Sequence, residues 1–287
     1  MPQSINTNLV SLNAQRNLTS NQSSLAVSMQ RLSSGLRVNS AKDDAAGLAI
    51  AERMQTKVRG MNVAIRNAND AISLSQTAEG ALGKVGDMLQ RMRELSVQAA
   101  NGTNTTTDRT SLNAEYLQLT RDAARTLSGT QFNGQSILAT TTASTFQVGA
   151  NTSATLDQIS VAAFDWTSVA NITTAIGAAV GTDPTTAIAG TDGSFALASI
   201  TAIDAAIDSV NSQRATFGAV QNRFDNVVAS LMVSVENQTA ARSRIMDADY
   251  ATETSNLSRA SILQQAGNAM VAQANQLPQQ VLALLQR

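Results

Sequence analysis

Long stretches of this chain carry apolar residues at helical spacing and contain almost no proline. The 287 residues include three prolines, namely Pro2, Pro184 and Pro278. Residues 3–183 therefore lack the strongest helix breaker, because proline removes a backbone donor and clashes with the preceding turn. Apolar side chains recur every three or four positions from residue 54 to residue 92, which predicts one helix over about 43–100. We expect this helix to begin at a capping box over 40–43 and to end at Asn101-Gly102.

Two further helical segments follow. One is predicted over about 107–129, with Thr107 or Asp108 as its cap, and the short turn before it would fold it back antiparallel. Between residues 200 and 235, apolar side chains follow a 3.5-residue repeat over nearly five heptads, a pattern typical of coiled coils. Its natural partner is the helix over 43–100. The expected fold is therefore mainly α, a long antiparallel helical bundle or coiled coil formed by the N- and C-terminal halves.

The middle of the chain has a different pattern. Phe146 and Val148 alternate with polar residues, as do Ile159 and Val161, and Gly149-Ala150-Asn151 follows the first pair. This alternation predicts a small β-hairpin region. Residues 164–194 carry weak signals dominated by Thr, Ala and Gly, and we interpret them as a small surface excursion with a short helix near 168–180.

Each end of the chain carries one apolar stripe in an otherwise polar segment. The stripe residues are Leu25, Met29, Leu32 and Leu36 near the start, and Leu263, Met270, Leu277, Val281 and Leu284 near the end. Neither segment has enough apolar mass to be a stable helix alone. Two interpretations remain open from the pattern: the ends order when the protein assembles, or they pack on each other within one monomer.

The residue supply argues against an enzyme. The chain has no Cys and no His, which removes disulfides, thiolate nucleophiles, the commonest general base and the commonest metal ligand. The carboxylate pairs Asp43-Asp44 and Asp247/Asp249 are better explained as helix ends, where negative charge is stabilised. The sequence therefore predicts no catalytic residues, no metal site and no cofactor.

The charge distribution divides the chain into segments. Residues 1–42 hold four basic residues and no acid, whereas residues 126–213 hold six Asp and no Lys or Arg. No basic patch is dense enough for nucleic-acid binding, and no apolar run approaches the roughly 20 residues of a membrane span. The first residues lack the basic and apolar regions of a signal peptide, so we expect no cleaved signal.

Long motifs at the two ends identify a family. Residues 32–47 read LSSGLRVNSAKDDAAG, residues 218–224 read GAVQNRF, residues 247–251 read DADYA, and residues 262–267 read ILQQAG. These motifs resemble the N- and C-terminal signatures of bacterial flagellins nearly residue for residue. The resemblance covers about 1–140 and 200–287.

The resemblance implies a structural subunit of the flagellar filament and a domain plan. Residues 1–42 and 250–287 would form an inner domain of terminal helices that lines the lumen as a coiled coil. Residues 43–163 and 195–249 would form a rod-like helical domain with the β-hairpin, and residues 164–194 leave no room for a large outer domain. The subunit would be exported through the flagellar channel and would lie outside the cell in the filament.

The resemblance also implies partners. These are further copies of the chain in a helical homopolymer, an export chaperone at the C-terminal segment, and the filament cap and hook-junction proteins. Host partners would be the animal Toll-like receptor 5, at Gln90, Arg91, Leu95 and Glu115, and a plant flagellin receptor kinase that reads Gln30 to Ala51. From the pattern alone, residues 90–95 are instead a solvated helix face around Met92.

The residues expected to pack subunits together are the apolar positions of the helical stripes. They are Leu25, Met29, Leu32, Leu36, Met54, Val58, Met61, Ile65, Leu89, Met92, Phe217, Phe224, Leu231, Leu263, Met270, Leu277, Val281 and Leu284. Two alternatives stay open: a hook–filament junction protein, which shares such terminal helices, and an enzyme or soluble binding module, which would require a pocket with convergent polar groups.

Overall fold

The computed structural model describes residues 7–177, 179–181, 183–184 and 187–285, and the side chains of these residues as far as Gln276. The chain divides into two compact units. One comprises Met1–Lys57 and Glu236–Arg287, and the other comprises Val58–Val235. We call them the terminal unit and the central unit.

Helices dominate both units, as predicted. In chain order the elements are α1 (Leu9–Ser34), α2 (Ala45–Ala100), α3 (Thr106–Gly129), β1 (Gln131–Phe132), β2 (Gln135–Ser136), β3 (Ser144–Gln147), β4 (Gln158–Val161), the 3₁₀ helix η1 (Trp166–Ser168), α4 (Ala170–Ile176), α5 (Ser194–Met246) and α6 (Tyr250–Leu285). The predicted end of the first long helix before Asn101-Gly102 and the predicted joint near 247–249 are both confirmed.

The caps predicted for the N-terminal ends of two helices, α2 and α3, were wrong. The Asp43 carboxylate accepts hydrogen bonds from Asn39 N and Ser40 N, so residues 40–43 form a separate turn rather than the helix cap. The helix α2 begins after Asp44, whose Oδ1 accepts from Gly47 N at 2.8 Å. The helix α3 is capped by Thr105, which forms a reciprocal capping box with Asp108.

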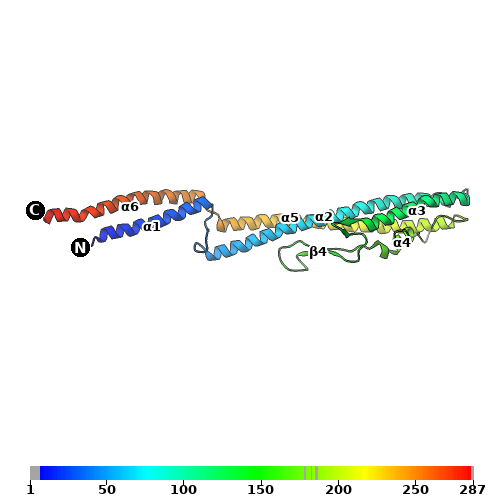
Figure 1. Cartoon of the computed structure of the whole chain (residues 1–287), viewed down its shortest axis with the longest axis horizontal. Helices are drawn as coiled ribbons and strands as arrows, with labels where there is room; N and C mark the ends of the chain where they lie inside the picture. Colours follow the sequence, from blue (N-terminus) through cyan, green and yellow to red (C-terminus); the bar gives the residue numbers. More distant parts are fainter. Residues whose placement is uncertain (1–6, 178, 182, 185–186, 286–287) are drawn as a thin grey trace. The chain divides into compact units, whose positions relative to one another are not determined.

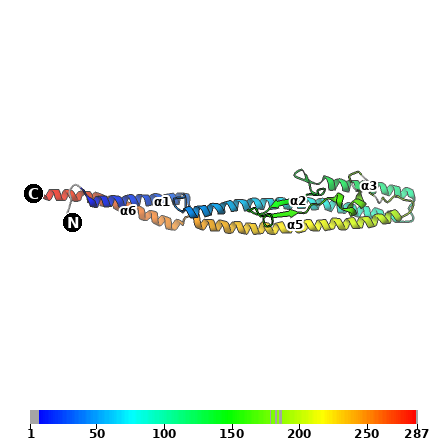
Figure 2. The same cartoon turned by 90° about the horizontal axis from the view of Figure 1, so that it is seen from below.

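The central unit has one apolar core built mainly by α2, α3 and α5, which lie side by side (Figures 1 and 2). Leu89 and Met92 of α2 are fully buried, and Phe217 and Phe224 of α5 pack against the same core. The ring of Phe224 meets Phe146 edge to face, with ring centroids 5.8 Å apart. The predicted pairing of the two long helical stripes therefore forms this core.

Two β-hairpins extend the same unit. The predicted hairpin is confirmed as β3 paired antiparallel with β4, with Phe146 opposite Ile159. A second hairpin, β1–β2, turns at Asn133-Gly134, where both residues have positive φ (50° and 78°). That combination is the two-residue turn that asparagine and glycine favour.

The segment 164–194 contributes to the core rather than only to the surface. Trp166 is buried in η1, and Ile172 and Ile176 are buried in α4, the short helix predicted near 168–180. The apolar repeat of this segment, Val169, Ile172 and Ile176, spans only about two turns, which is too short for periodicity to show that these side chains are buried.

The buried charge of Arg109 joins two segments at one end of the central unit. Arg109 of α3 is 4% exposed, and its guanidinium donates to the carbonyl oxygens of Ala99 (2.9 Å), Asn101 (3.2 Å) and Thr191 (3.1 Å). Ala99 lies in the last turn of α2, where the carbonyl groups lack helical partners and carry partial negative charge. Arg109 thus ties the α2 end to the segment that leads into α5.

The terminal unit is built on the pairing of α1 with α6, which run antiparallel side by side (Figure 1). Near the start of α1, Asn8 Nδ2 donates to Ala274 O at 2.7 Å, and Ser11 Oγ donates to Asn275 Oδ1 at 2.6 Å. At the other end of the pair, the Tyr250 hydroxyl donates to Leu32 O at 2.9 Å. The two ends of the chain therefore contact each other within one monomer.

Candidate assembly surface

The contact between α1 and α6 is poor in large apolar side chains. Its least exposed positions recur alternately three and four residues apart, and we call them the seam: Ser11, Ala14, Leu18, Asn21, Leu25, Ser28 and Leu32 on α1, and Glu253, Leu257, Ala260, Gln264, Gly267, Val271 and Ala274 on α6. Only five of these fourteen residues are Leu or Val. The spacing is that of a coiled coil, but the composition provides little apolar burial.

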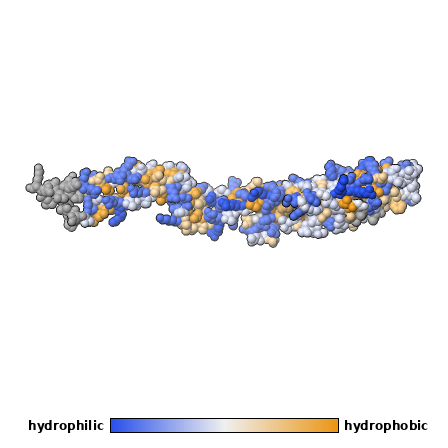
Figure 3. All heavy atoms as spheres, viewed as in Figure 1, coloured by the Kyte–Doolittle hydropathy of each residue, from blue (hydrophilic) through white to orange (hydrophobic). Residues whose placement is uncertain are grey.

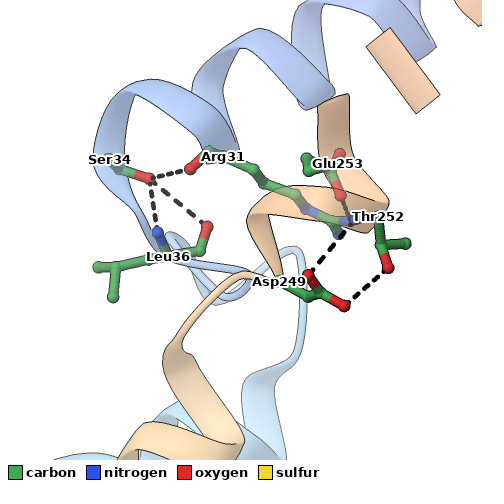
Figure 4. A network of polar contacts seen from close by, with 6 residues as sticks. All are labelled: Arg31, Ser34, Leu36, Asp249, Thr252 and Glu253. Atoms are coloured by element: carbon green, nitrogen blue, oxygen red, sulfur yellow. Dashed lines mark hydrogen bonds and ion pairs between the residues drawn. The ribbon is translucent and has the colours of Figure 1, made fainter. Parts of the chain in front are cut away.

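A charged pair lies at one end of the seam. Figure 4 shows Arg31 of α1 reaching toward Glu253 of α6, with a closest separation of 3.9 Å between the guanidinium and the carboxylate. The Glu253 side chain is buried, and Arg31 Nε has no hydrogen-bond partner. At this separation the attraction is weak against the cost of removing both charges from water, so the pair adds little stability.

Side-chain hydrogen bonds cap the end of α1 and the start of α6 beside this pair. Ser34 Oγ accepts from Leu36 N at 3.2 Å, and Asp249 caps α6 by accepting from Ala251 N and from the Thr252 hydroxyl (Figure 4). The hydrogen bonds of Thr252 and Ala251 lower the pKa of Asp249 from its ordinary value, since they stabilise the ionised carboxylate.

An open groove of about 450 Å³ runs between α1 and α6. It is lined by Asn21, Ser23, Ser24, Val27, Ser28, Arg31, Glu253, Asn256, Arg259, Ala260 and Leu263. Val27 and Leu263, on opposite walls, are both exposed. The two helices therefore leave apolar surface beside their own contact.

Large apolar side chains point outward from both helices, and we call them the outward apolar set. Its members are Leu9, Val10, Leu12, Val27 and Met29 on α1, and Ile262, Leu263 and Met270 on α6. Leu9 is 71% exposed and Ile262 is 66% exposed. Figure 3 shows hydrophobic side chains scattered among polar ones over the visible face of this pair.

The outward apolar set surrounds α1 instead of following one stripe. Because consecutive helical residues turn by about 100°, Leu9 and Leu12 share one side of α1 and Val10 points away from them, and Val27 and Met29 flank the seam on opposite sides. A helix that is apolar on several faces is typical of a buried environment. Among the described helices, α6 is the one that packs along α1, so most of this surface has no cover from the described residues of the terminal unit.

The predicted packing residues lie in several different environments. Met29, Leu263 and Met270 belong to the outward apolar set, whereas Leu25 and Leu32 lie in the seam. Leu36 packs with Val38, Ala51 and Met246 in a small cluster of the terminal unit. Met54, Ile65 and Leu231 are half-buried, and Val58 and Met61 are buried. The side chains of Leu277, Val281 and Leu284 lie outside the described residues.

Four predicted packing residues need a correction. Leu89, Met92, Phe217 and Phe224 are at most 2% exposed and belong to the core of the central unit. They stabilise the subunit itself and have no surface to offer to a second copy. The helical stripe that predicted them does not distinguish contacts within a chain from contacts between chains.

The predicted receptor patch is only partly at the surface. Arg91 is exposed and donates to Glu94 Oε2 at 2.8 Å and to Glu115 Oε1 at 3.0 Å, which raises the pKa of Arg91. Gln90 is exposed beside it. Leu95, however, is 1% exposed and belongs to the core, so it is not available on this surface.

Sequence reasoning missed part of the outward apolar set. Val10, Val27 and Ile262 were not expected at an interface, because they lie off the periodic stripes that organised the prediction. The signal that could have found them is the presence of apolar residues on more than one face of a short, otherwise polar helix.

The Asp and Glu residues of the described part of the chain form no group of three that could hold a metal ion. None of its helices is long and apolar enough to cross a membrane.

Comparison with known proteins identifies the family. The model of the bacterial flagellin N-terminal helical region matches residues 5–143, and that of the C-terminal helical region matches residues 200–285. A flagellin of Halalkalibacterium halodurans is 45% identical over 98% of this chain and 99% of its own length. A flagellin of Bacillus subtilis is 42% identical over 98% of this chain and 99% of its own length.

A solved structure supports the fold independently. It is described as a flagellar hook-associated protein of Vibrio parahaemolyticus, and it superposes with a TM-score of 0.59 over 71% of this chain and 100% of its own. At 12% identity the likeness concerns the helical fold alone. The two family regions and the full-length relatives decide between the alternatives: this chain belongs to the bacterial flagellins, the structural proteins that form the flagellar filament.

Proposed function

We propose that the outward apolar set of α1 and α6 is the surface on which copies of this chain pack in the flagellar filament. The observation that carries the proposal is the contrast between a small, polar seam and large apolar side chains directed outward. In a filament, neighbouring α1 and α6 helices would cover those side chains. Burying each Leu, Ile or Met would contribute about 1.5–3 kcal/mol.

The geometry of such an assembly is open-ended. The exposed positions of α1 and α6 are different surfaces of one chain, so a copy that uses one surface leaves the other free for the next copy. Heterologous contacts of this kind generate helical polymers when the rotation does not close. In this proposal residues 1–42 and 250–287, which lie within the terminal unit, form the inner, lumen-lining domain. Residues 43–163 and 195–249 form the rod-like domain with its hairpins.

The proposal includes export and capping partners. The subunit would travel through the flagellar channel without a cleaved signal peptide and would join the extracellular filament at its distal end, beneath the cap protein. The first copies would join the hook-junction proteins. The amphipathic C-terminal segment within α6 would bind the export chaperone as a helix in a groove.

Host recognition is a separate part of the proposal. The exposed residues Gln90, Arg91 and Glu115 would form the part of the Toll-like receptor 5 contact that is at the surface in the monomer. Within Gln30 to Ala51, the segment read by the plant receptor kinase, Arg37 N donates to Met246 O at 2.6 Å and Val38 is buried. This segment would have to leave residues 245–248 before a receptor could bind it in extended form.

Seeded assembly of paired variants tests the packing surface. Leu263→Gln combined with Ile262→Gln removes two outward side chains without touching the seam. We expect at least a tenfold rise in the critical concentration for filament growth, because a loss of about 1.4 kcal/mol per subunit corresponds to that factor. The measurement is the sedimentable fraction over a concentration series, with electron microscopy of the pellets.

The matched control is Gln265→Asn, an exposed polar residue in the same turn of α6. It should leave the critical concentration unchanged, and circular dichroism should show equal helix content in all three proteins. Normal filament growth by the Leu263/Ile262 variant would show that α6 does not use this surface for assembly.

A further inference from the structure

Six of the described methionines lie in two opposite environments, and Met54 and Met88 are half-buried. Met29, Met232 and Met270 are 57%, 55% and 59% exposed, although methionine is usually a core residue. Met61, Met92 and Met246 are at most 8% exposed. Two of the exposed methionines belong to the outward apolar set, one on each helix of the terminal unit. The third lies on α5 in the central unit.

We propose that Met29 and Met270 are oxidation sites that control assembly: peroxide converts them to methionine sulfoxide in the free subunit, and the oxidised subunit no longer adds to filaments. The inference rests on the proposed function, since it requires that these two side chains become buried between copies. The proposed modification is methionine sulfoxidation, its reagent is a peroxide, and it occurs in the free subunit.

The reaction balances without a cofactor. The thioether sulfur attacks one oxygen of hydrogen peroxide, the O–O bond breaks, an S–O bond forms, and the remaining oxygen leaves as water after proton transfer. The sulfur is oxidised by two electrons and the peroxide is reduced by two. Oxidation follows access to the sulfur, so the exposed methionines should react first, and thiol-dependent reductases can reverse the change.

Oxidation should weaken assembly because methionine sulfoxide is more polar than methionine. A sulfoxide is a strong dipole, whereas the thioether is a flexible apolar group that packs easily against other side chains. Burying the sulfoxide without a hydrogen-bond partner would oppose the association that the thioether favours. In the monomer both side chains already face water, so oxidation there should leave the helices of the terminal unit unchanged.

The first test maps oxidation in two states of the protein. Purified monomer and intact filament are exposed to the same hydrogen peroxide concentration, and peptide mass spectrometry follows each methionine. In the monomer, Met29 and Met270 should oxidise at least tenfold faster than Met92 and Met246. In the filament, the rates of Met29 and Met270 should fall at least tenfold. Equal rates in monomer and filament would overturn the proposal.

The second test separates the modification from the surface. Met29→Leu/Met270→Leu keeps the apolar bulk but cannot form a sulfoxide, and it should assemble normally before and after peroxide. Unmodified protein should show at least a tenfold higher critical concentration after peroxide. Met232→Leu is the control, and it should remain as peroxide-sensitive as the unmodified chain. Protection by Met232→Leu instead would overturn the assignment to Met29 and Met270.

A third variant distinguishes a failure of the proposed packing surface from a failure of the oxidation inference alone. Met29→Gln/Met270→Gln places permanent polar groups at the same positions. If it assembles normally, these positions do not lie at the interface, and the proposed packing surface fails there. If it fails to assemble while peroxide leaves unmodified subunits competent, only the oxidation inference is wrong.

Discussion

The central unit and the terminal unit both pair long helices, but they place their apolar side chains differently. In the central unit, Phe217, Phe224 and Trp166 join Leu and Ile residues in a continuous apolar core. In the terminal unit, small or polar residues occupy nine of the fourteen seam positions, and many large apolar side chains point away from the seam. The difference indicates that the core of the central unit stabilises it within one chain, whereas the large apolar side chains of the terminal unit remain exposed in the monomer and, in our proposal, pack against other copies.

The largest expected effect tests the central core against the seam. Phe224→Ala should lower the free energy of unfolding of the central unit by about 3–5 kcal/mol, because it leaves a cavity beside Phe146. Leu18→Ala, at a half-buried seam position, should cost only about 1 kcal/mol. Urea unfolding, combined with hydrogen exchange resolved by helix, measures both. Equal losses would show that the seam is as well packed as the core.

A second prediction concerns the buried charge that fastens the central unit. Arg109→Met removes the donors to three backbone carbonyls and should destabilise the unit by about 3 kcal/mol. The control is Arg121→Met on the same helix, which loses only an exposed ion pair with Asp183 and should change stability by at most about 0.5 kcal/mol. The thermal midpoints of the two variants should therefore separate clearly. Coinciding midpoints would mean that Arg109 is dispensable.

A third change should make the two units more alike. Arg31→Met combined with Glu253→Leu replaces a poorly paired charged contact in the seam with apolar side chains. We expect a gain of about 1–2 kcal/mol in the stability of the α1–α6 pair, because the desolvation cost of the charges disappears. Slower hydrogen exchange in α6 of the monomer would report it. Faster exchange would show that the ion pair stabilises the seam.

The smallest expected effect is a pH dependence at the helix starts. Hydrogen bonds from Thr105 lower the pKa of Asp108 from its ordinary value of 3.8, and those from Thr252 and Ala251 lower that of Asp249. Both contributions are complete above the ordinary pKa and disappear as the pH falls through the lowered value. Asp108→Asn should therefore flatten the acid side of the stability curve of the central unit, measured by thermal unfolding between pH 5 and about 2. An unchanged acid limb would exclude a contribution from this cap.

Periodicity predicted the helices and the pairing of α2 with α5, because each of these helices buries one continuous stripe. It could not predict the burial of Trp166 and Ile172, because the apolar repeat in their segment is only about two turns long. It also could not assign Leu95 or Phe217 to contacts within the chain, because spacing identifies an apolar face but not what covers it. The outward apolar set is visible only once the seam shows which face each helix has already used.

The antiparallel pairing of α1 with α6 joins the first part of the chain to the last. Asn8 and Ala274, which share a hydrogen bond, are 266 positions apart in the sequence. A ribosome that stops before residue 250 therefore releases a chain whose α1 has nothing to pair with, however well its central unit folds. If the proposed packing surface is correct, only a chain translated through α6 can present the paired surface, so truncated chains would not add to a growing filament.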